Sequence, residues 1–197
     1  VTIINGYGIT ECSPIVALNR NNNIKYGTVG NPLRNTEIKI QDPDENGEGE
    51  IWVKGDIVMM GYYHNEAETA RVLKDGWFNT EDIGKFENNF LSITGRKKNI
   101  IILDNGKNVY PEEIETMLSF IDNVGEVVVY QEDNVIVAEI YSDAEGDKAA
   151  IQAQIKADIK KVNSQLAVYK QINRVKFRDE EFIKTTTKKI KRDLIVR

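Results

Sequence analysis

The first residues suited to chemistry lie near the start of the chain, in the segment from Asn5 to Glu11. The segment follows a predicted strand, and loops after the carboxyl ends of strands bind ligands in open α/β sheets. Gly6 and Gly8 would let a ligand approach the backbone closely. The Thr10 hydroxyl suits a phosphate oxygen, and the Glu11 carboxylate suits a Mg²⁺ ion bound to that phosphate. On spacing alone, a plain turn is an equally good interpretation.

A second group lies between Trp77 and Gly84, where aromatic residues precede the acidic pair Glu81-Asp82. A carboxylate beside a nucleotide commonly accepts hydrogen bonds from ribose hydroxyls, and Asp82 is the candidate for that contact. An Asp near a Gly is more often a turn former than a ligand, so the residue types alone favour a turn.

A third group is Gly95-Arg96-Lys97-Lys98. The Arg96 guanidinium offers several donors to ribose or phosphate oxygens. Lys98 lies where backbone torsions would change between two parts of the chain. Taken alone, such a cluster is more commonly a solvated basic surface.

The fourth group is the segment from Lys184 to Arg197, which contains six basic residues and one acidic residue. A basic tail of this kind could bind nucleic acid or another anionic surface. The aromatic residues that single-strand binders place among their basic residues are missing from it, so we do not expect nucleic acid as a partner.

The composition is that of an ordinary globular protein. The 197 residues include 26 Lys plus Arg and 31 Asp plus Glu, giving a formal net charge of −5, and 41% are hydrophobic. No apolar run approaches the roughly 20 residues of a membrane helix. The single cysteine, Cys12, and the single histidine, His64, exclude an internal disulfide and the usual Cys/His zinc site. We therefore expect a reducing, cytoplasmic location.

The charge balance changes near Gly95. Residues 1–95 carry 8 basic and 14 acidic side chains (net −6), and residues 96–197 carry 18 and 17 (net +1). The first part begins with Val1 to Ile4, which predicts a buried strand. Because such a strand needs neighbours, we expect a fragment of a longer chain.

The rest of the first part predicts a small antiparallel β unit. Strand-like runs at residues 37–40 and 50–53 are separated by turn-rich segments. A helix is predicted from Asn65 to Leu73, with Asn65 as its N-cap and acidic residues in its first turn.

The second part predicts a compact α+β domain of about 100 residues. A helix is expected to start at Pro111, and a hairpin is expected from residues 126–130 and 134–141. Apolar residues recur at helical spacing from Ile151 to Leu166, which predicts an amphipathic helix that faces a sheet. A last strand is predicted over residues 172–177.

Taken in order, these segments resemble the adenylate-forming superfamily of acyl-CoA synthetases, peptide-synthetase adenylation domains and luciferases. Each segment is weakly specific alone, but six in the family's order are a strong signal, which reverses the interpretations above. They are Tyr7 to Glu11, Gly49 to Gly55 with Gly61 to Tyr63, Trp77 to Gly84, Gly95 to Lys98, Asn108 to Glu115, and Lys184 to Arg192.

The resemblance implies a ligase that uses ATP and Mg²⁺ in two steps. A carboxylate attacks the α-phosphate of ATP to give acyl-AMP and pyrophosphate, and a thiol then displaces AMP. It assigns adenine contact to Tyr7, with Gly8 beside the nucleotide, and phosphate contact to Thr10. The remaining assignments are Glu11 for Mg²⁺, Asp82 and Arg96 for the ribose, Lys189 for adenylation, and Lys98 for the hinge of a mobile C-terminal domain.

The resemblance also implies an organisation and a subclass. Residues 1–94 would end the large adenylating domain with a β-rich subdomain, and residues 95–197 would form the mobile α+β domain, whose short sheet is flanked by helices. Lys98 at the hinge is typical of fatty acyl-CoA synthetases, so CoA is the expected acceptor. The alternatives are an adenylation domain that loads a carrier-protein phosphopantetheine thiol and a noncatalytic anion-binding module. Peripheral membrane contact is left open.

Two residues depart from the family pattern. Glu81 replaces the Gly that commonly precedes the ribose Asp, and Lys188 replaces the Gly before the adenylation lysine. Torsions that Gly permits are less available to other residues, so the local backbone is in question. The phosphate loop and most of the acyl pocket would precede Val1, so we expect this chain alone to be inactive.

Overall fold

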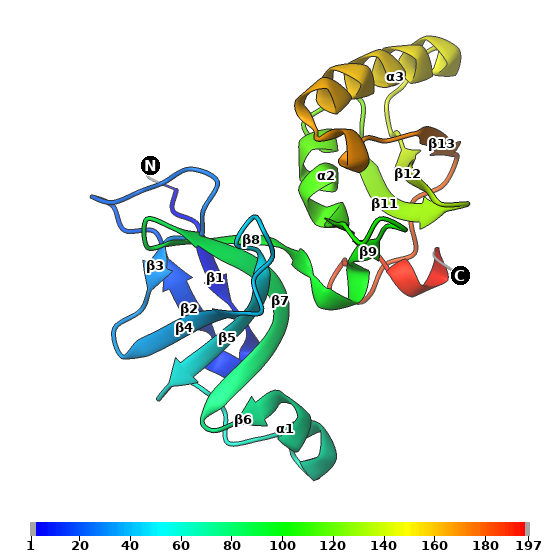
Figure 1. The fold of residues 1–197 in the computed structure, drawn as a ribbon. Coiled ribbons are helices and arrows are strands. Elements are labelled where there is room, and N and C mark those ends of the chain that lie inside the picture. Colours follow the sequence, from blue (N-terminus) through cyan, green and yellow to red (C-terminus); the bar gives the residue numbers. More distant parts are fainter. Residues whose placement is uncertain (1–2, 196–197) are drawn as a thin grey trace. The chain divides into compact units, whose positions relative to one another are not determined.

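The computed structural model describes residues 3–195, which form two compact units that divide between Lys98 and Asn99. We call the residues up to Lys98 unit 1 and those from Asn99 unit 2. Each has its own sheets and its own hydrophobic core (Figure 1). The predicted boundary at residues 94 and 95 lies inside a strand, β8, which runs from Phe90 to Arg96. The division therefore falls after this strand.

Unit 1 contains two antiparallel sheets and one short helix. The smaller sheet has the order β1-β2-β3. The larger has the order β4-β5-β7-β6, and β8 also pairs with β7. The bounds are β1 Gly6–Gly8, β2 Ile15–Leu18, β3 Asn31–Pro32, β4 Thr36–Gln41, β5 Gly49–Gly55, α1 Glu66–Val72, β6 Leu73–Lys74, β7 Trp77–Glu87 and β8 Phe90–Arg96.

The core of unit 1 follows from the period-two alternation of its strands. In β5, Ile51 and Val53 are fully buried while the residues beside them are not. They pack with Phe78 of β7 and Leu91 of β8. The predicted strands at 37–40 and 50–53 are confirmed as β4 and β5, and the side chain of Asn65 caps α1 as predicted, accepting from the Glu68 backbone at 3.2 Å.

The predicted opening strand is wrong where it can be judged. Val1 and Thr2 lie outside the described residues, and Ile3 and Ile4 belong to no strand and are 84% and 38% exposed. Pairing with β2 starts only at Gly6, opposite Leu18. One more backbone bond, from the Asn19 N–H to the Asn5 carbonyl at 2.9 Å, extends this pairing, and among the described residues no strand is paired with the two isoleucines.

Unit 2 is built on the three-stranded sheet β11-β12-β13, with a two-stranded ribbon, β9-β10, beside it. The hairpin β11-β12 is antiparallel and β13 joins β12 in parallel. The bounds are β9 Ile101–Ile102, β10 Asn108–Val109, α2 Pro111–Leu118, β11 Glu126–Glu132, β12 Val135–Tyr141, α3 Lys148–Gln165 and β13 Arg174–Arg178.

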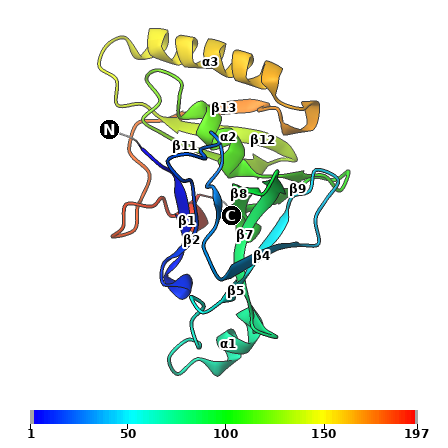
Figure 2. The ribbon, with the colours of Figure 1, turned by 90° about the vertical axis from the view of Figure 1, so that its left-hand side faces the viewer.

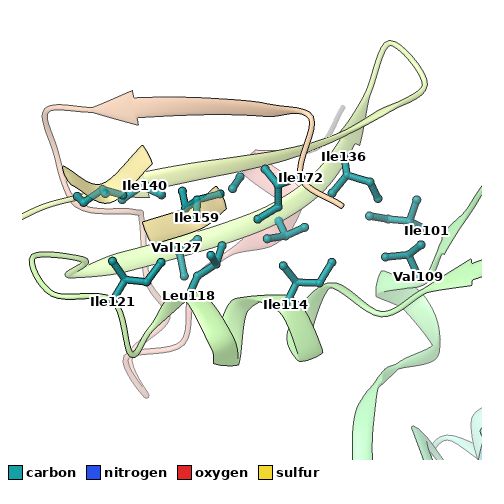
Figure 3. Close-up of a cluster of buried hydrophobic side chains, with 13 residues drawn as sticks. Ile101, Val109, Ile114, Leu118, Ile121, Val127, Ile136, Ile140, Ile159 and Ile172 are labelled. Atoms are coloured by element: carbon teal, nitrogen blue, oxygen red, sulfur yellow. The ribbon is translucent and has the colours of Figure 1, made fainter. Parts of the chain in front are cut away.

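The two helices of unit 2 cover one face of this sheet. Ile114 of α2 and Ile155 of α3 are fully buried in a cluster that includes Val129 of β11. Figure 3 shows Ile114 and Leu118 of α2 in this cluster. Figure 2 shows α3 lying along the sheet. The predicted helices and hairpin are confirmed, and the predicted strand over 172–177 is displaced to Arg174–Arg178. The expected α+β class is confirmed.

The opposite face of the sheet is covered by the C-terminal segment instead of a helix. Alternate residues of β11, Val128 and Tyr130, pack there against Phe182, which is 2% exposed. Among residues 3–195, no helix combines the length and the apolar character needed to cross a bilayer.

The core of unit 2 predicts a clear difference between buried and exposed truncations. Ile114→Ala should lower the free energy of unfolding of unit 2 by about 2–5 kcal/mol, because it removes buried methyl groups and leaves a cavity. The matched control is Phe120→Ala, whose ring is 83% exposed and whose loss should change stability by about 0.5 kcal/mol or less. Urea unfolding followed by circular dichroism measures both. Equal effects would contradict this core.

Candidate functional site

Three of the predicted nucleotide-binding residues meet in unit 1, on three different strands. Asp82 of β7 lies opposite Arg96 of β8, and Arg96 Nε is 3.0 Å from Asp82 Oδ1. The hydroxyl of Tyr7, from β1, donates to Asp82 Oδ2 at 2.5 Å. The Asp82 backbone N–H donates to the Thr80 hydroxyl at 3.1 Å, which fixes the turn before the carboxylate. The bond from Tyr7 to Asp82 links the smaller sheet to the larger one.

This cluster is covered by protein on most sides. Asp82 is 4% exposed and Tyr7 is 9% exposed, whereas half of the Arg96 side chain is accessible. Burial, and then the charge of Asp82, raises the pKa of the Tyr7 phenol well above its usual range, so Tyr7 is a neutral hydrogen-bond donor. A ligand would reach the cluster from the side of the Arg96 guanidinium.

The mutual contact of Tyr7 and Asp82 was not predicted from the sequence. The two residues were assigned separately to adenine and to ribose, and 75 positions separate them. In the structure the Tyr7 ring belongs to the hydrophobic core of unit 1. The hydroxyl of Tyr7 bonds to the Asp82 carboxylate. The signal that could have predicted this pair is a tyrosine in a strand together with an acidic residue in the Trp77 to Gly84 segment.

The predicted phosphate and metal residues lie on a short 3-10 helix, Thr10–Cys12, directly after β1. Thr10 is exposed and Glu11 is half-buried. The Glu11 carbonyl accepts from the Met59 backbone N–H at 2.8 Å, and its carboxylate oxygen Oε1 accepts from the Tyr62 hydroxyl at 3.0 Å. Burial, and then the hydrogen bond to Glu11, raises the pKa of Tyr62 to about 12.

Tyr62 is therefore a site residue that sequence reasoning missed. From the sequence, Tyr62 receives no role beyond its place in the Gly61 to Tyr63 segment. The ring of Tyr62 packs against the core of unit 1, and its hydroxyl orients the Glu11 carboxylate. Its position in the Gly61 to Tyr63 segment of the family pattern was the available signal.

Glu11 fits the way in which Mg²⁺ is commonly held beside a nucleotide. Among the described residues, no three His, Cys, Asp or Glu side chains gather into a metal site. Mg²⁺ usually keeps several waters and binds one or two carboxylates together with substrate phosphates. The single, oriented and half-exposed carboxylate of Glu11 suits that arrangement and not a cage built by protein alone.

Gly8 has a structural reason to be glycine. A Cβ built on it would lie 2.2 Å from the carbonyl oxygen of Pro14. The same carbonyl accepts from the Ile9 backbone N–H at 2.7 Å. The close approach that Gly8 permits in unit 1 is therefore to the turn at Pro14, and ligand contact by Gly8 stays a prediction.

Both departures from the family pattern keep a backbone that glycine would favour. Glu81 has φ +59° and Lys188 has φ +61°. Glu81 is held by its backbone N–H, which donates to Asn79 Oδ1 at 2.9 Å, and by an ion pair with Arg71 at 2.7 Å. The left-handed conformation thus persists at both positions without glycine.

The hinge candidate, Lys98, lies at the end of unit 1. Lys98 is exposed in a short 3-10 turn, Lys97–Asn99, and is the last residue of the unit. The residue before it is fixed, because Lys97 Nζ lies 2.5 Å from Glu50 Oε1. The other oxygen of Glu50 accepts from Asn79 Nδ2 at 2.7 Å. The turn at Lys98 therefore starts from a fixed point in the sheet.

Lys189 lies in unit 2, apart from the residues above in sequence and in fold. It is exposed on a tight turn between Lys184 and Ile190, which form an isolated β-bridge. Among residues 3–195, no ion pair is found for its ammonium group. Its role in adenylation stays a prediction.

The single cysteine and the single histidine of the chain both lie in unit 1. Cys12 is fully buried in the core of unit 1, and burial, followed by the charge of Glu11, raises the pKa of its thiol to about 12. His64 is exposed in the loop before α1.

Comparison with known proteins agrees with this arrangement. The profile of the AMP-binding enzyme family matches residues 1–63. A long-chain-fatty-acid–CoA ligase from Haemophilus influenzae is 48% identical over 133 residues, which cover 64% of this chain and 24% of that protein. A long-chain-fatty-acid–CoA ligase from Yersinia pestis is 40% identical over 144 residues, covering 70% and 25%. The chain thus spans about a quarter of the length of these relatives.

Solved structures show the same fold. An anthranilate–CoA ligase in complex with anthranoyl-AMP superposes with a TM-score of 0.83 at 25% identity, covering 99% of this chain and 39% of that one. The o-succinylbenzoate–CoA synthetase from Bacillus subtilis, solved with ATP and magnesium, gives 0.78 at 27% identity, covering 95% and 40%.

These findings show that the chain is similar to part of the adenylate-forming, AMP-binding enzymes. Within that class it resembles the long-chain fatty acyl-CoA ligases.

The buried hydroxyl and thiol of unit 1 predict a loss of stability in alkali. The folded pKa values of Tyr7 and Cys12 lie above their ordinary values of 10.0 and 9.0. Their contribution is therefore fully present below about pH 9 and decreases as the pH rises toward the folded pKa values. Urea unfolding at pH 8 and pH 11, followed by tryptophan fluorescence, should show this decrease.

Two variants provide the control for the alkaline effect. Tyr7→Phe and Cys12→Ala should each unfold more easily at pH 8 yet lose less stability between pH 8 and pH 11 than the unaltered chain does. Identical decreases in all three proteins would contradict the assignment to these two groups. Both tryptophans, Trp52 and Trp77, lie in unit 1, so the fluorescence signal reports on that unit.

Proposed function

We propose that this chain is part of an ATP- and Mg²⁺-dependent acyl-CoA ligase that activates a fatty acid as acyl-AMP and transfers the acyl group to CoA. The observation that carries the proposal is the convergence of Tyr7, Asp82 and Arg96, which the family pattern assigns to one nucleotide. The similarity to long-chain-fatty-acid–CoA ligases supports the substrate class. We also propose a cytoplasmic location, where ATP and CoA are available.

In unit 1 the proposed work is binding and orientation of the nucleotide. Each Asp82 oxygen has two lone pairs, so a ribose hydroxyl can donate to the carboxylate while Tyr7 and Arg96 keep it in place. The Arg96 guanidinium, which is half exposed, has further donors for ribose oxygens. We propose that Thr10, whose side chain is exposed, donates its hydroxyl to a phosphate oxygen.

Glu11 would hold Mg²⁺ beside that phosphate. When bound, the ion supplies charge stabilisation for the phosphate oxygens and the departing pyrophosphate. The contribution of the chain is the orientation of one carboxylate by the Tyr62 hydroxyl, while the Met59 backbone N–H holds the main-chain carbonyl of Glu11.

In unit 2 the proposed work is stabilisation of charge in the first half-reaction. A carboxylate oxygen of the acid forms a bond to the α-phosphorus of ATP, and the bond from that phosphorus to pyrophosphate breaks. The Lys189 ammonium would contact the oxygens whose charge changes, and removing one such donor commonly costs about 2.7–4 kcal/mol of barrier.

The second half-reaction would need a different face of unit 2. The CoA sulfur attacks the acyl carbonyl carbon, AMP departs with the electron pair, and the thiol proton is released. We propose that rotation at Lys98 exchanges the two arrangements. The fixed contact of Lys97 with Glu50 supports a pivot at the next residue.

Acceptor choice separates the proposal from its nearest alternative. The full-length enzyme, supplied with ATP and a fatty acid, should form a thioester with CoA. Efficient transfer to a carrier-protein phosphopantetheine thiol, with none to CoA, would favour an adenylation domain instead. We propose that the chain by itself forms no acyl-AMP, because it spans about a quarter of the length of its relatives.

A lysine substitution tests the role of unit 2. In the full-length enzyme, Lys189→Ala should lower the rate of acyl-AMP formation by at least about a hundredfold, because a donor to the reacting oxygens is lost. CoA transfer from supplied acyl-AMP should remain near the unaltered rate. Pyrophosphate release measures the first step and thioester formation the second. Lys188→Ala, at the neighbouring exposed lysine, is the matched control. An equal loss in both steps would contradict the assignment.

A second substitution tests the ribose contact. Asp82→Asn keeps an oxygen acceptor and the size of the side chain but removes the charge that pairs with Arg96. ATP affinity, measured by calorimetry on the full-length enzyme, should fall about tenfold, in keeping with the loss of one charged hydrogen bond of about 1.5–3 kcal/mol. Glu50→Gln, which leaves the Asp82 contacts intact, is the control. Unchanged affinity in Asp82→Asn would exclude a ribose role.

A further inference from the structure

The segment that carries Lys189 is folded against unit 2 and is not a free basic tail. After β13 ends at Arg178, the chain crosses the face of the sheet opposite α2 and α3. Phe182 is buried there with Val128 and Val137, and Ile190 packs against the same cluster. The apolar residues on both sides of Lys189 therefore fix the course of the segment.

The leading end of this segment is held by Glu126, the first residue of β11. Its Oε2 accepts from the Phe182 backbone N–H at 2.9 Å. Its Oε1 forms an ion pair with Lys184 Nζ. The Glu126 carboxylate thus binds both the backbone and a side chain just before the turn.

The trailing end is held by Glu115, from α2. Its Oε1 accepts from the Val129 backbone N–H at 2.6 Å, and its Oε2 forms an ion pair with Arg192. Arg192 also donates to the Val129 carbonyl at 3.3 Å. Only 16% of the Glu115 side chain and 21% of the Arg192 side chain are exposed, so this pair is more shielded from solvent than a surface pair.

Between these two points the turn holds its own shape. The Thr185 backbone N–H donates to the Lys189 carbonyl at 2.7 Å, and the Lys189 N–H donates to the Thr185 hydroxyl at 3.2 Å. The Lys191 N–H donates to the Ile183 carbonyl at 2.8 Å. The backbone of Lys189 is thus fixed on both sides, while its side chain is exposed.

We propose that Glu115 and Glu126 are positioning residues for adenylation: they hold the two ends of the Lys189 turn, so that its ammonium reaches the reacting oxygens from a fixed origin. We call the two carboxylates the clamp. The inference rests on the proposed role of Lys189. It assigns a function to Glu115, the last residue of the Asn108 to Glu115 motif.

The pairing also explains part of the basic segment. Two of its cations, Lys184 and Arg192, are neutralised by the clamp, which leaves the exposed lysines on the turn itself as its unpaired charges among the described residues. A module built to bind anions along the whole tail would have kept these cations accessible. The arrangement favours a role for the exposed Lys189 over anion binding along the whole basic segment.

The test uses Glu115→Gln in the full-length enzyme. Gln can still accept from the Val129 N–H, but it cannot pair with Arg192 as a charge. We expect faster hydrogen exchange at the Thr185 and Lys191 amides and a fall of about tenfold to a hundredfold in the kcat of acyl-AMP formation, because small misplacements of reacting groups have effects of that size. The KM for ATP and the transfer from supplied acyl-AMP to CoA should not change. Glu126→Gln should act in the same direction.

Glu113→Gln is the matched control. Glu113 lies on the same helix as Glu115, and the substitution removes its ion pair of 2.6 Å with Lys170, which is not part of the Lys189 turn. It should leave both the exchange and the kcat unchanged. Wild-type exchange and kcat in Glu115→Gln, with Lys189→Ala inactive, would overturn the clamp alone. A rise in the KM for ATP together with equal falls in the rates of both half-reactions would also overturn it. Normal acyl-AMP formation by Lys189→Ala would instead refute the proposed function.

Discussion

The interaction on which unit 1 depends is the buried carboxylate of Asp82, held by Tyr7 on one oxygen and by Arg96 on the other. A charge so far from solvent is costly unless it is paired and hydrogen-bonded, and both conditions are met here. Removing either partner would take one compensating contact from a buried charge, so residues of three strands must meet at one point. The same requirement joins the small sheet to the large one. The site is therefore not an addition to the fold of unit 1 but one of the contacts that define it.

Unit 2 must bury two apolar faces of one sheet, and its helices cover only one of them. Ile114 and Ile155 lie on the covered face, and the segment around Phe182 covers the other. Covering a sheet with an irregular segment leaves backbone groups to be satisfied, and the Glu126 carboxylate at the start of β11 accepts from one of them, the Phe182 N–H. The exposed lysine turn is the part of this cover that projects from it. Its chemistry therefore depends on packing that extends over the whole sheet.

Local patterns in the sequence predicted the elements well and their contacts poorly. Three features that depend on neighbours only a few positions away were predicted: the alternation in β5, the Asn65 cap and the apolar stripe of α3. The bond from Tyr7 to Asp82 and the bond from Tyr62 to Glu11 join residues 75 and 51 positions apart, which no periodicity reports. Of the strand expected at Val1 to Ile4, the described residues Ile3 and Ile4 are not in a strand, because β-branched residues predict a strand only where a partner strand exists. Residue identities thus gave Tyr7, Asp82 and Arg96 as candidates and missed Tyr62, whereas tertiary pairing determined how these side chains are held.

Glu81 and Lys188 show where backbone shape matters more than residue type. A left-handed conformation costs a residue other than glycine roughly 1–2 kcal/mol, so it persists only where the surroundings determine it. At Glu81 the surroundings are the Asn79 side chain and the ion pair with Arg71. At Lys188 the backbone N–H donates to the Thr185 carbonyl at 2.9 Å inside the turn. Each strained residue directly precedes a predicted functional residue, Asp82 or Lys189. The two turns keep the same backbone geometry although the usual glycine is gone, and this is the result expected if that geometry aims the side chain that follows.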